Sequence, residues 1–256
     1  MDMYIDTHAH LNDERLLAET EQIVADMEKD QISHIINVGW DIDSSQKAIE
    51  ISEKYERMYA IIGIHPHESS KVKEKDYQLL YDYSRNTNVV GYGEIGLDFY
   101  HNLSPKDIQE RVFREQIEIA FDAKLPLILH VREAYQLTYD ILKDMSKFLT
   151  NGLILHCYSG SAEMVKRFSE FDAYFSLGGA ITFKNANKES VAKEIPEERL
   201  LLETDCPYMT PVPKRGEINY PKYIKYVGEK LAYWFPYRDI ARTTSENALR
   251  IFAKIQ

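Results

Sequence analysis

Cysteine is scarce in this sequence: Cys157 and Cys206 are the only two among 256 residues. Two cysteines cannot form an extensive disulfide framework, which favours a protein of the reducing cytoplasm. The N-terminal residues lack the basic start and the apolar run of a signal peptide. No stretch approaches the ~20 consecutive apolar residues that a membrane-spanning helix needs. These absences predict a soluble cytoplasmic protein with no membrane partner.

Basic residues are also in deficit, because 31 Lys and Arg face 41 Asp and Glu and leave a net charge of −10. A protein that coats long duplexes neutralises phosphates with a basic stripe, so the charge argues against that class. It leaves room for an enzyme that holds a few nucleotides in a pocket. Bound cations would offset part of the acidic excess.

Low-complexity tracts, proline-rich linkers and short repeats are missing, and what is present is an alternation of short apolar runs with longer amphipathic stretches. The apolar runs predict eight buried strands. These are Met3–Asp6, Ser33–Val38, Met58–Gly63, Val89–Glu94, Leu127–His130, Leu153–His156, Ala173–Ser176 and Leu200–Glu203. The clearest helical segments are Glu14–Lys29, Lys106–Ala123, Lys222–Leu231 and Arg238–Ala253.

Strands that alternate with helices predict a parallel sheet with helical crossovers. For 256 residues, an α/β fold of the (β/α)8 TIM-barrel type is the economical solution, with residues 1–256 forming a single domain. A doubly wound open sheet is the alternative that the pattern leaves open.

Metal-binding residue types gather where the predicted strands end. Six of the eight histidines fall there, whereas His34 and His101 do not fit the scheme. In a barrel the carboxyl ends of the strands form one face, on which active sites are built. One such histidine is more often structural than a ligand, but several on one face with buried carboxylates need a positive partner. The predicted metal ligands are His8, His10, Glu94, His130, His156 and Asp205.

The order of these residues along the strands suggests two divalent ions. Residues i and i+2 of an extended segment point the same way, so His8 and His10 reach one ion together. His130 and His156 follow neighbouring strands and are placed to hold a second ion. Glu94 lies between the two groups and can bridge them. Imidazole and carboxylate ligands suit Zn, Mn or Fe, and carboxylate with water suits Mg.

Six sequence blocks resemble, in order and spacing, those of the TatD family of metal-dependent DNases. They are Asp6–Leu11, Gly63–His67, Gly93–Asp98, Leu129–Ala134, His156–Gly160 and Glu203–Tyr208, and the resemblance runs from Asp6 to about Asn247. It implies an amidohydrolase-like TIM barrel and hydrolysis of DNA phosphodiester bonds, often from the 3′ end of single strands. It also implies the same ligand roles as the strand positions do.

Several further residues have predicted roles around this centre. Glu94 and Asp205 are the predicted catalytic residues, with Asp205 as general base. The predicted substrate contacts are His65, Arg132, Tyr158 and Arg215, with Tyr208 as a second stacking aromatic and His67 less favoured. Glu203 is predicted to orient a ligating histidine. Cys206 has no dedicated base and is not expected to be a nucleophile.

We therefore predict a divalent-metal deoxyribonuclease that acts as a monomer on single-stranded DNA or other nucleic-acid ends. The alternative is a small-molecule amidohydrolase or phosphoesterase that uses the same metals. Such relatives often bridge their ions with a carboxylated lysine, and Glu94 at the bridging position favours the nuclease. A catalytically silent metal-binding protein is a third interpretation, which the full ligand set disfavours.

Overall fold

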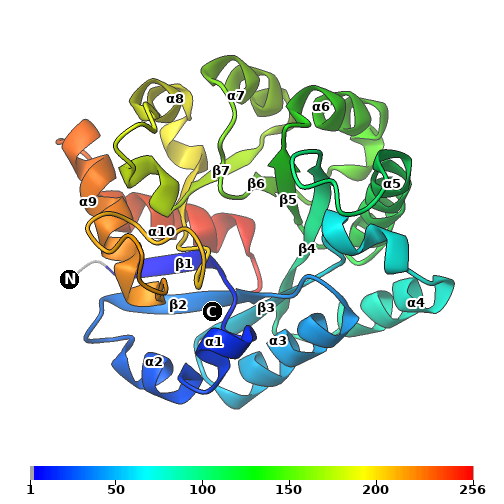
Figure 1. Cartoon of the computed structure of the whole chain (residues 1–256), viewed down its shortest axis with the longest axis horizontal. Coiled ribbons are helices and arrows are strands. Elements are labelled where there is room, and N and C mark those ends of the chain that lie inside the picture. The colour runs from blue at the N-terminus through cyan, green and yellow to red at the C-terminus, as the bar shows by residue number, and fades with distance from the viewer. Residues whose placement is uncertain (1–2, 256) are drawn as a thin grey trace.

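A computed structural model describes residues 3–255, in which eight parallel strands follow one another in space as they do in sequence. The strands are β1 (Tyr4–Ala9), β2 (Ile32–Val38), β3 (Met58–Ile62), β4 (Val89–Asp98), β5 (Leu127–Arg132), β6 (Leu153–Leu155), β7 (Tyr174–Leu177) and β8 (Leu200–Leu202). Figure 1 shows the helices arranged around the outside of the strands. The fold is the predicted (β/α)8 TIM barrel.

The helices follow the predicted alternation. They are α1 (Glu14–Leu17), α2 (Thr20–Asp26), α3 (Ile42–Lys54), α4 (Glu74–Tyr83), α5 (Lys106–Asp122), α6 (Tyr135–Asp144), α7 (Ala162–Phe168), α8 (Glu189–Glu194), α9 (Ile224–Trp234) and α10 (Ile240–Ile251). Among the residues described, no helix has the length and apolar character that crossing a bilayer requires.

The barrel closes where the segment after β8 meets β1. The Asp205 amide donates to the His8 carbonyl at 2.8 Å, and the His10 amide donates to the Cys206 carbonyl at 2.7 Å. Below them, the buried Asp6 carboxylate accepts the amide and the hydroxyl of Thr204 at 2.9 and 2.6 Å. The alternative of an open doubly wound sheet is therefore wrong.

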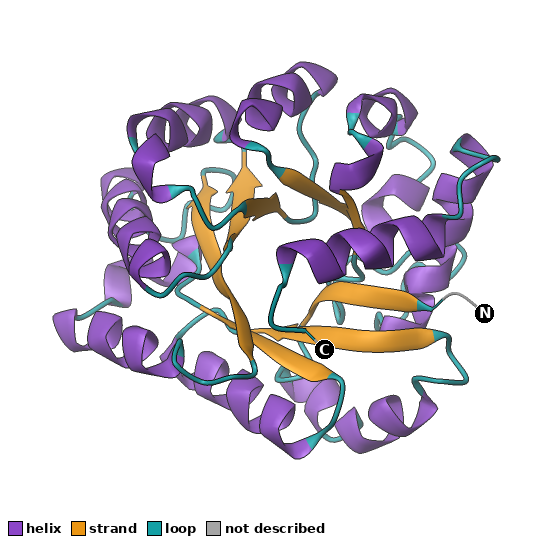
Figure 2. Cartoon of the chain, turned by 180° about the vertical axis from the view of Figure 1, so that it is seen from behind, coloured by secondary structure: helices purple, strands orange, loops and turns teal. Residues whose placement is uncertain are grey.

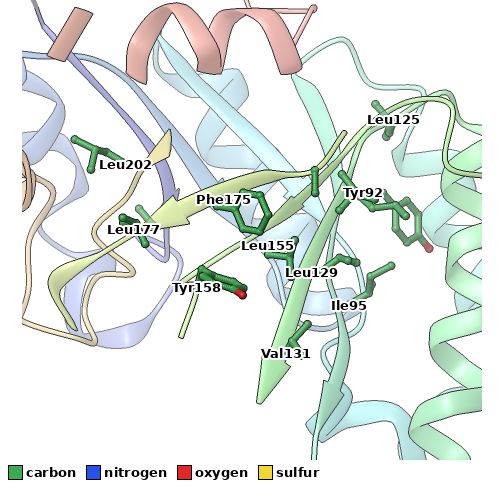
Figure 3. Packing of buried hydrophobic residues seen from close by; sticks show 14 of the residues in the cluster. Tyr92, Ile95, Leu125, Leu129, Val131, Leu155, Tyr158, Phe175, Leu177 and Leu202 are labelled. Atoms are coloured by element: carbon green, nitrogen blue, oxygen red, sulfur yellow. The ribbon is translucent and has the colours of Figure 1, made fainter. Parts of the chain in front are cut away.

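Two apolar clusters hold the barrel together. Inward-facing residues fill the interior, with at least one from each strand, and they include Ile36, Ile61 and Ile128. Ala248 and Phe252, at the end of α10, join this cluster. Figure 2 shows α10 lying in front of the strands. The larger cluster lies between the strands and the helices, and part of it is drawn in Figure 3. The floor of the barrel is thus closed, and only its carboxyl end is open for a site.

Most predicted elements differ by a few residues at their ends, and two differences matter most for the fold around the site. Strand β4 continues beyond Glu94 to Asp98, because Ile95 to Asp98 pair with Leu129 to Arg132 of β5. The predicted helix Glu14–Lys29 is divided into α1 and α2. At the division the buried Thr20 hydroxyl bonds the carbonyls of Leu11 and Leu16, at 3.5 and 3.4 Å.

Candidate metal centre

Glu94 lies at the middle of the site and directs its two carboxylate oxygens to two different pairs of imidazoles. Oε1 is 2.6 Å from His130 Nδ1 and 2.7 Å from His156 Nε2. Oε2 is 3.4 Å from His8 Nε2 and 3.9 Å from His10 Nε2. The structure therefore brings all four histidines to one carboxylate, as the strand positions predicted.

The hydrogen bonds that these rings make on the side away from Glu94 determine which ring nitrogen has a free lone pair. That nitrogen is the one that faces Glu94. His10 Nδ1 donates to the Val38 carbonyl at 2.9 Å, so the neutral ring has its lone pair on Nε2. His130 Nε2 donates to Asp98 Oδ2 at 3.1 Å, which leaves the lone pair of a neutral ring on Nδ1. In both rings the inward nitrogen is the one near Glu94, as a metal ligand must be.

The spacing within each pair tests whether the residues fit an ion. His8 Nε2 and His10 Nε2 are 3.3 Å apart, and His130 Nδ1 and His156 Nε2 are also 3.3 Å apart. Two nitrogens bound tetrahedrally to one zinc ion at ~2.0 Å lie roughly 3.3 Å from one another. The donor types and their spacing fit one divalent ion at each pair.

Asp205 joins the first pair from the loop that closes the barrel. Its Oδ1 is 3.4 Å from His10 Nε2, and its ligand atom lies within 4.8 Å of those of His8 and His156. All six predicted ligands thus come together at the carboxyl end of the barrel.

Burial and mutual charge shift the titration of these groups. Burial, together with the neighbouring His156, lowers the pKa of His8 to about 4. Burial alone would raise the pKa of Glu94, but the surrounding imidazoles of His156, His65 and His130 hold it well below its usual range. Glu94 is therefore an anion at neutral pH, 4% exposed and surrounded by nitrogens. A buried anion of this kind is stabilised when cations pair with it.

Two further carboxylates stand behind the ligating rings. Glu203 is fully buried, accepts the Cys157 amide at 2.6 Å and lies 3.5 Å from His156 Nδ1, on the side of the ring away from Glu94. Asp98 occupies the same position behind His130. Sequence reasoning predicted the place of Glu203 but missed that of Asp98, whose signal was its position at the end of the continued β4.

A cavity of about 560 Å³ opens above the centre. It is lined by five of the six predicted ligands, all but the deeper His8, and by His65 and Arg132. The exposed Arg132 guanidinium stacks over the Tyr100 ring, 4.4 Å from its centroid. His65 Nδ1 accepts the His67 amide at 3.1 Å, so its proton lies on Nε2, which is 3.5 Å from Glu94 Oε1. His65 therefore presents a donor to the cavity.

The predicted roles of Tyr158 and Arg215 do not agree with their positions. Tyr158 is 3% exposed, its ring packs edge-on against Phe175 and its hydroxyl donates to the Ser161 carbonyl at 2.8 Å. Figure 3 shows it among the apolar core residues. Arg215 is exposed, stacks over Phe183 at 4.1 Å and is not among the residues that line the cavity. Neither side chain lines the cavity.

Other aromatic and histidine side chains take their places at the rim. Trp40 lies edge-on to His10 at 5.5 Å, and Tyr208, 47% exposed, lies edge-on to the same ring at 6.0 Å. Trp40, which follows β2, was missed because tryptophan is not a metal-binding residue type. The expectation that His101 lies outside the site is wrong: both His67 and His101 line the cavity and contact Asp98.

Comparison with known proteins identifies the family of this chain. The family model described as TatD related DNase matches residues 5–253. The chain belongs to this family. The metal-dependent hydrolase YabD of Bacillus subtilis (strain 168), named as uncharacterized, is 42% identical over 98% of this chain and 99% of its own. A 3′-5′ ssDNA/RNA exonuclease TatD of Salmonella typhimurium is 29% identical over 90% of each chain.

Solved structures agree with this assignment. The crystal structure of YJJV, a TatD homolog from Escherichia coli k12, superposes with a TM-score of 0.92 at 28% identity and covers 98% of both chains. An organophosphorus hydrolase from Deinococcus radiodurans, at 12% identity and a TM-score of 0.66, shares the fold alone. The protein is thus a metal-dependent hydrolase of the TatD related DNase family.

Proposed function

We propose that this protein is a deoxyribonuclease that removes nucleotides from the 3′ end of single-stranded DNA. The observation that carries the proposal is Glu94, whose two oxygens each face a separate pair of imidazole nitrogens. This arrangement suits two divalent ions, of Mg, Mn or Zn, bridged by Glu94. The name of the Salmonella relative, a 3′-5′ ssDNA/RNA exonuclease, supports the choice of substrate.

Divalent ions held here would lower the pKa of a bound water and neutralise charge on a phosphate. The protein's own residues supply the rest. Glu94 and Asp205 would ligate the ions, and Asp205, which lines the cavity, would accept the proton of the attacking water. The rings of His10, His130 and His156 are backed by the Val38 carbonyl, Asp98 and Glu203, respectively.

The cavity walls fit a single strand better than a duplex. His65 presents its Nε2 proton and Arg132 its guanidinium, and both are donors for phosphate oxygens. Trp40 and Tyr208 offer ring faces or edges on which an unpaired base can stack. The net charge of −10 argues against long contacts along a duplex. We therefore assign the substrate contacts to His65, Arg132, Trp40 and Tyr208. Tyr158 and Arg215 are no longer among them.

We also propose that this protein is a cytoplasmic monomer with a single domain. The family match over 5–253 supports one barrel domain that spans residues 1–256. Two free cysteines suit a reducing cytoplasm, and a monomer suffices because all six ligands come from one chain.

The test is hydrolysis of end-labelled DNA by chelator-stripped protein, with and without added Mg²⁺, Mn²⁺ or Zn²⁺. We expect metal-dependent shortening of single strands that starts at the 3′ end, lost in Glu94→Ala and Asp205→Ala. Glu68→Gln is the matched control, since Glu68 lines the same cavity but pairs with Lys71. Full activity of both alanine variants would overturn the site assignment. No cleavage with any metal would overturn the nuclease and favour the small-molecule phosphoesterase or amidohydrolase.

A further inference from the structure

A second group of histidines surrounds a carboxylate at the edge of the cavity. Asp98 Oδ2 lies 2.9 Å from His67 Nε2, 3.0 Å from His101 Nδ1 and 3.1 Å from His130 Nε2. His67 belongs to the 3-10 helix η1 (Pro66–Lys71), Asp98 ends β4, and His101 lies in the loop before α5. Only His130 of these three rings also faces Glu94 closely, with its other nitrogen.

Asp98 Oδ2 faces three imidazole nitrogens, which is more hydrogen-bond donors than one carboxylate oxygen accepts well. A carboxylate oxygen has about two lone-pair sites. His130 uses one of them, because its Nε2 proton leaves its Nδ1 lone pair for the central site. One lone-pair site then remains for His67 and His101 together. A divalent cation placed among them would bind that lone pair and both nitrogens at once.

The second oxygen of Asp98 cannot accept a hydrogen bond from any of these rings, since it already accepts two others. Asp98 Oδ1 accepts the amides of Tyr100 and His101, at 3.0 and 2.8 Å. The carboxylate is fully buried, so no change of rotamer is available without loss of these bonds. Oδ2 is therefore fixed toward the three rings.

Buried polar residues hold the two loops around Asp98. The fully buried Gln109 side chain accepts the Asp98 amide at 2.9 Å and donates to the Ser104 carbonyl at 2.7 Å. The Ser104 hydroxyl, also buried, donates to the His67 carbonyl at 2.8 Å. The backbones that carry His67 and His101 are thus tied to the same strand end. A site whose ligands are positioned before binding loses less entropy when the ion enters.

We propose that His67, Asp98 and His101 form a third divalent-cation site, separate from the two ions at Glu94. Two imidazoles with one carboxylate suit Zn²⁺ and related first-row ions, and leave positions open for water or an oxyanion. All three residues line the cavity, so the open positions face it. Asp98 is shared, because it also positions His130, and the third ion is therefore linked to the central pair.

The third site is tested by counting ions, a readout that needs no substrate and is independent of the nuclease assay. Chelator-stripped protein is titrated with Zn²⁺ calorimetrically, and its metal content is measured after desalting from excess Zn²⁺. We expect three ions per chain for the unaltered protein and two for His101→Ala and His67→Gln. His34→Ala, which removes a histidine from β2 outside the group, is expected to keep three.

A Zn²⁺-soaked crystal locates the ions by anomalous scattering, with a third peak expected between His67, Asp98 and His101. His101→Gln repeats the count with a side chain of similar size, should the alanine variant fold poorly. Two ions per chain in the unaltered protein, no peak at Asp98, or a third ion that persists in both His101 variants would overturn the proposal.

Discussion

The charge of Glu203 is expected to strengthen metal binding at a distance, through His156. Replacing Glu203 by Gln keeps the shape of the side chain and an oxygen for the Cys157 amide, which Glu203 accepts at 2.6 Å. It removes the negative charge that lies 3.5 Å from His156 Nδ1. The other nitrogen of that ring, Nε2, is the one that faces Glu94 and the central site. A less basic His156 is a weaker ligand.

The size of this effect can be bounded from the distance. At 3.5 Å and an effective dielectric constant of about 20, one full charge pair contributes about 5 kcal/mol, which is an upper limit. The amide dipole of Gln retains part of this favourable interaction with His156. Carboxylates behind ligating histidines typically change metal affinity by about 10- to 100-fold. We therefore expect a loss of about 1.4 to 2.8 kcal/mol in the free energy of binding.

The assay is competition for Zn²⁺ against a chromophoric chelator, at fixed pH and ionic strength. Glu68→Gln is the matched control, because it removes one carboxylate charge from the cavity without touching a ligand. An affinity for Glu203→Gln equal to that of Glu68→Gln would refute the reasoning, since it would show that only the net charge of the cavity matters.

Three further outcomes follow from contacts described here. Arg132→Gln should lower kcat/KM for single-stranded DNA by about 10- to 100-fold, mostly through KM, because it removes a charged hydrogen-bond donor; an unchanged KM in steady-state assays would exclude the contact. Cys206→Ser should stay active with its metals bound, since burial raises the pKa of this thiol well above its usual range and the thiolate is not formed; loss of activity with full metal content would contradict this. Gly96→Ala should destabilise the fold by about 2 to 4 kcal/mol in urea unfolding, because φ is +137° and a Cβ would lie 2.1 Å from the His130 carbonyl oxygen. Gly216→Ala, at φ +91° with open space around it, isolates the backbone strain, and equal losses in the two variants would show that the clash is relieved.

The convergence of the candidate ligands was predictable because it depends on strand position alone. A residue at the end of a parallel strand must lie at the carboxyl face, whichever way the neighbouring loops run. His8, His10, Glu94, His130 and His156 needed no more than the strand positions, and small errors in strand length did not move them to the other face.

The residues around the ligands depended on details that strand position does not fix. Asp98 and His101 were missed because the continued pairing of β4 with β5 carries the chain four residues past Glu94 before it turns. Tyr158 was placed wrongly because a tyrosine just after a strand can face either the cavity or the helices. Here Phe175 and Tyr135 surround its ring and hold it in the core.

The seam of the barrel bears on how the protein is made. Asp6 and Thr204, whose side chains are hydrogen-bonded across that seam, are 198 residues apart, and the candidate ligands His10 and Asp205 lie on opposite sides of it. On the ribosome His8 and His10 emerge well before Asp205, which follows them by nearly 200 residues. A fragment that stops before β8 therefore has only part of the ligand set. Complete metal loading would then report that a molecule contains both sides of the seam and has joined them.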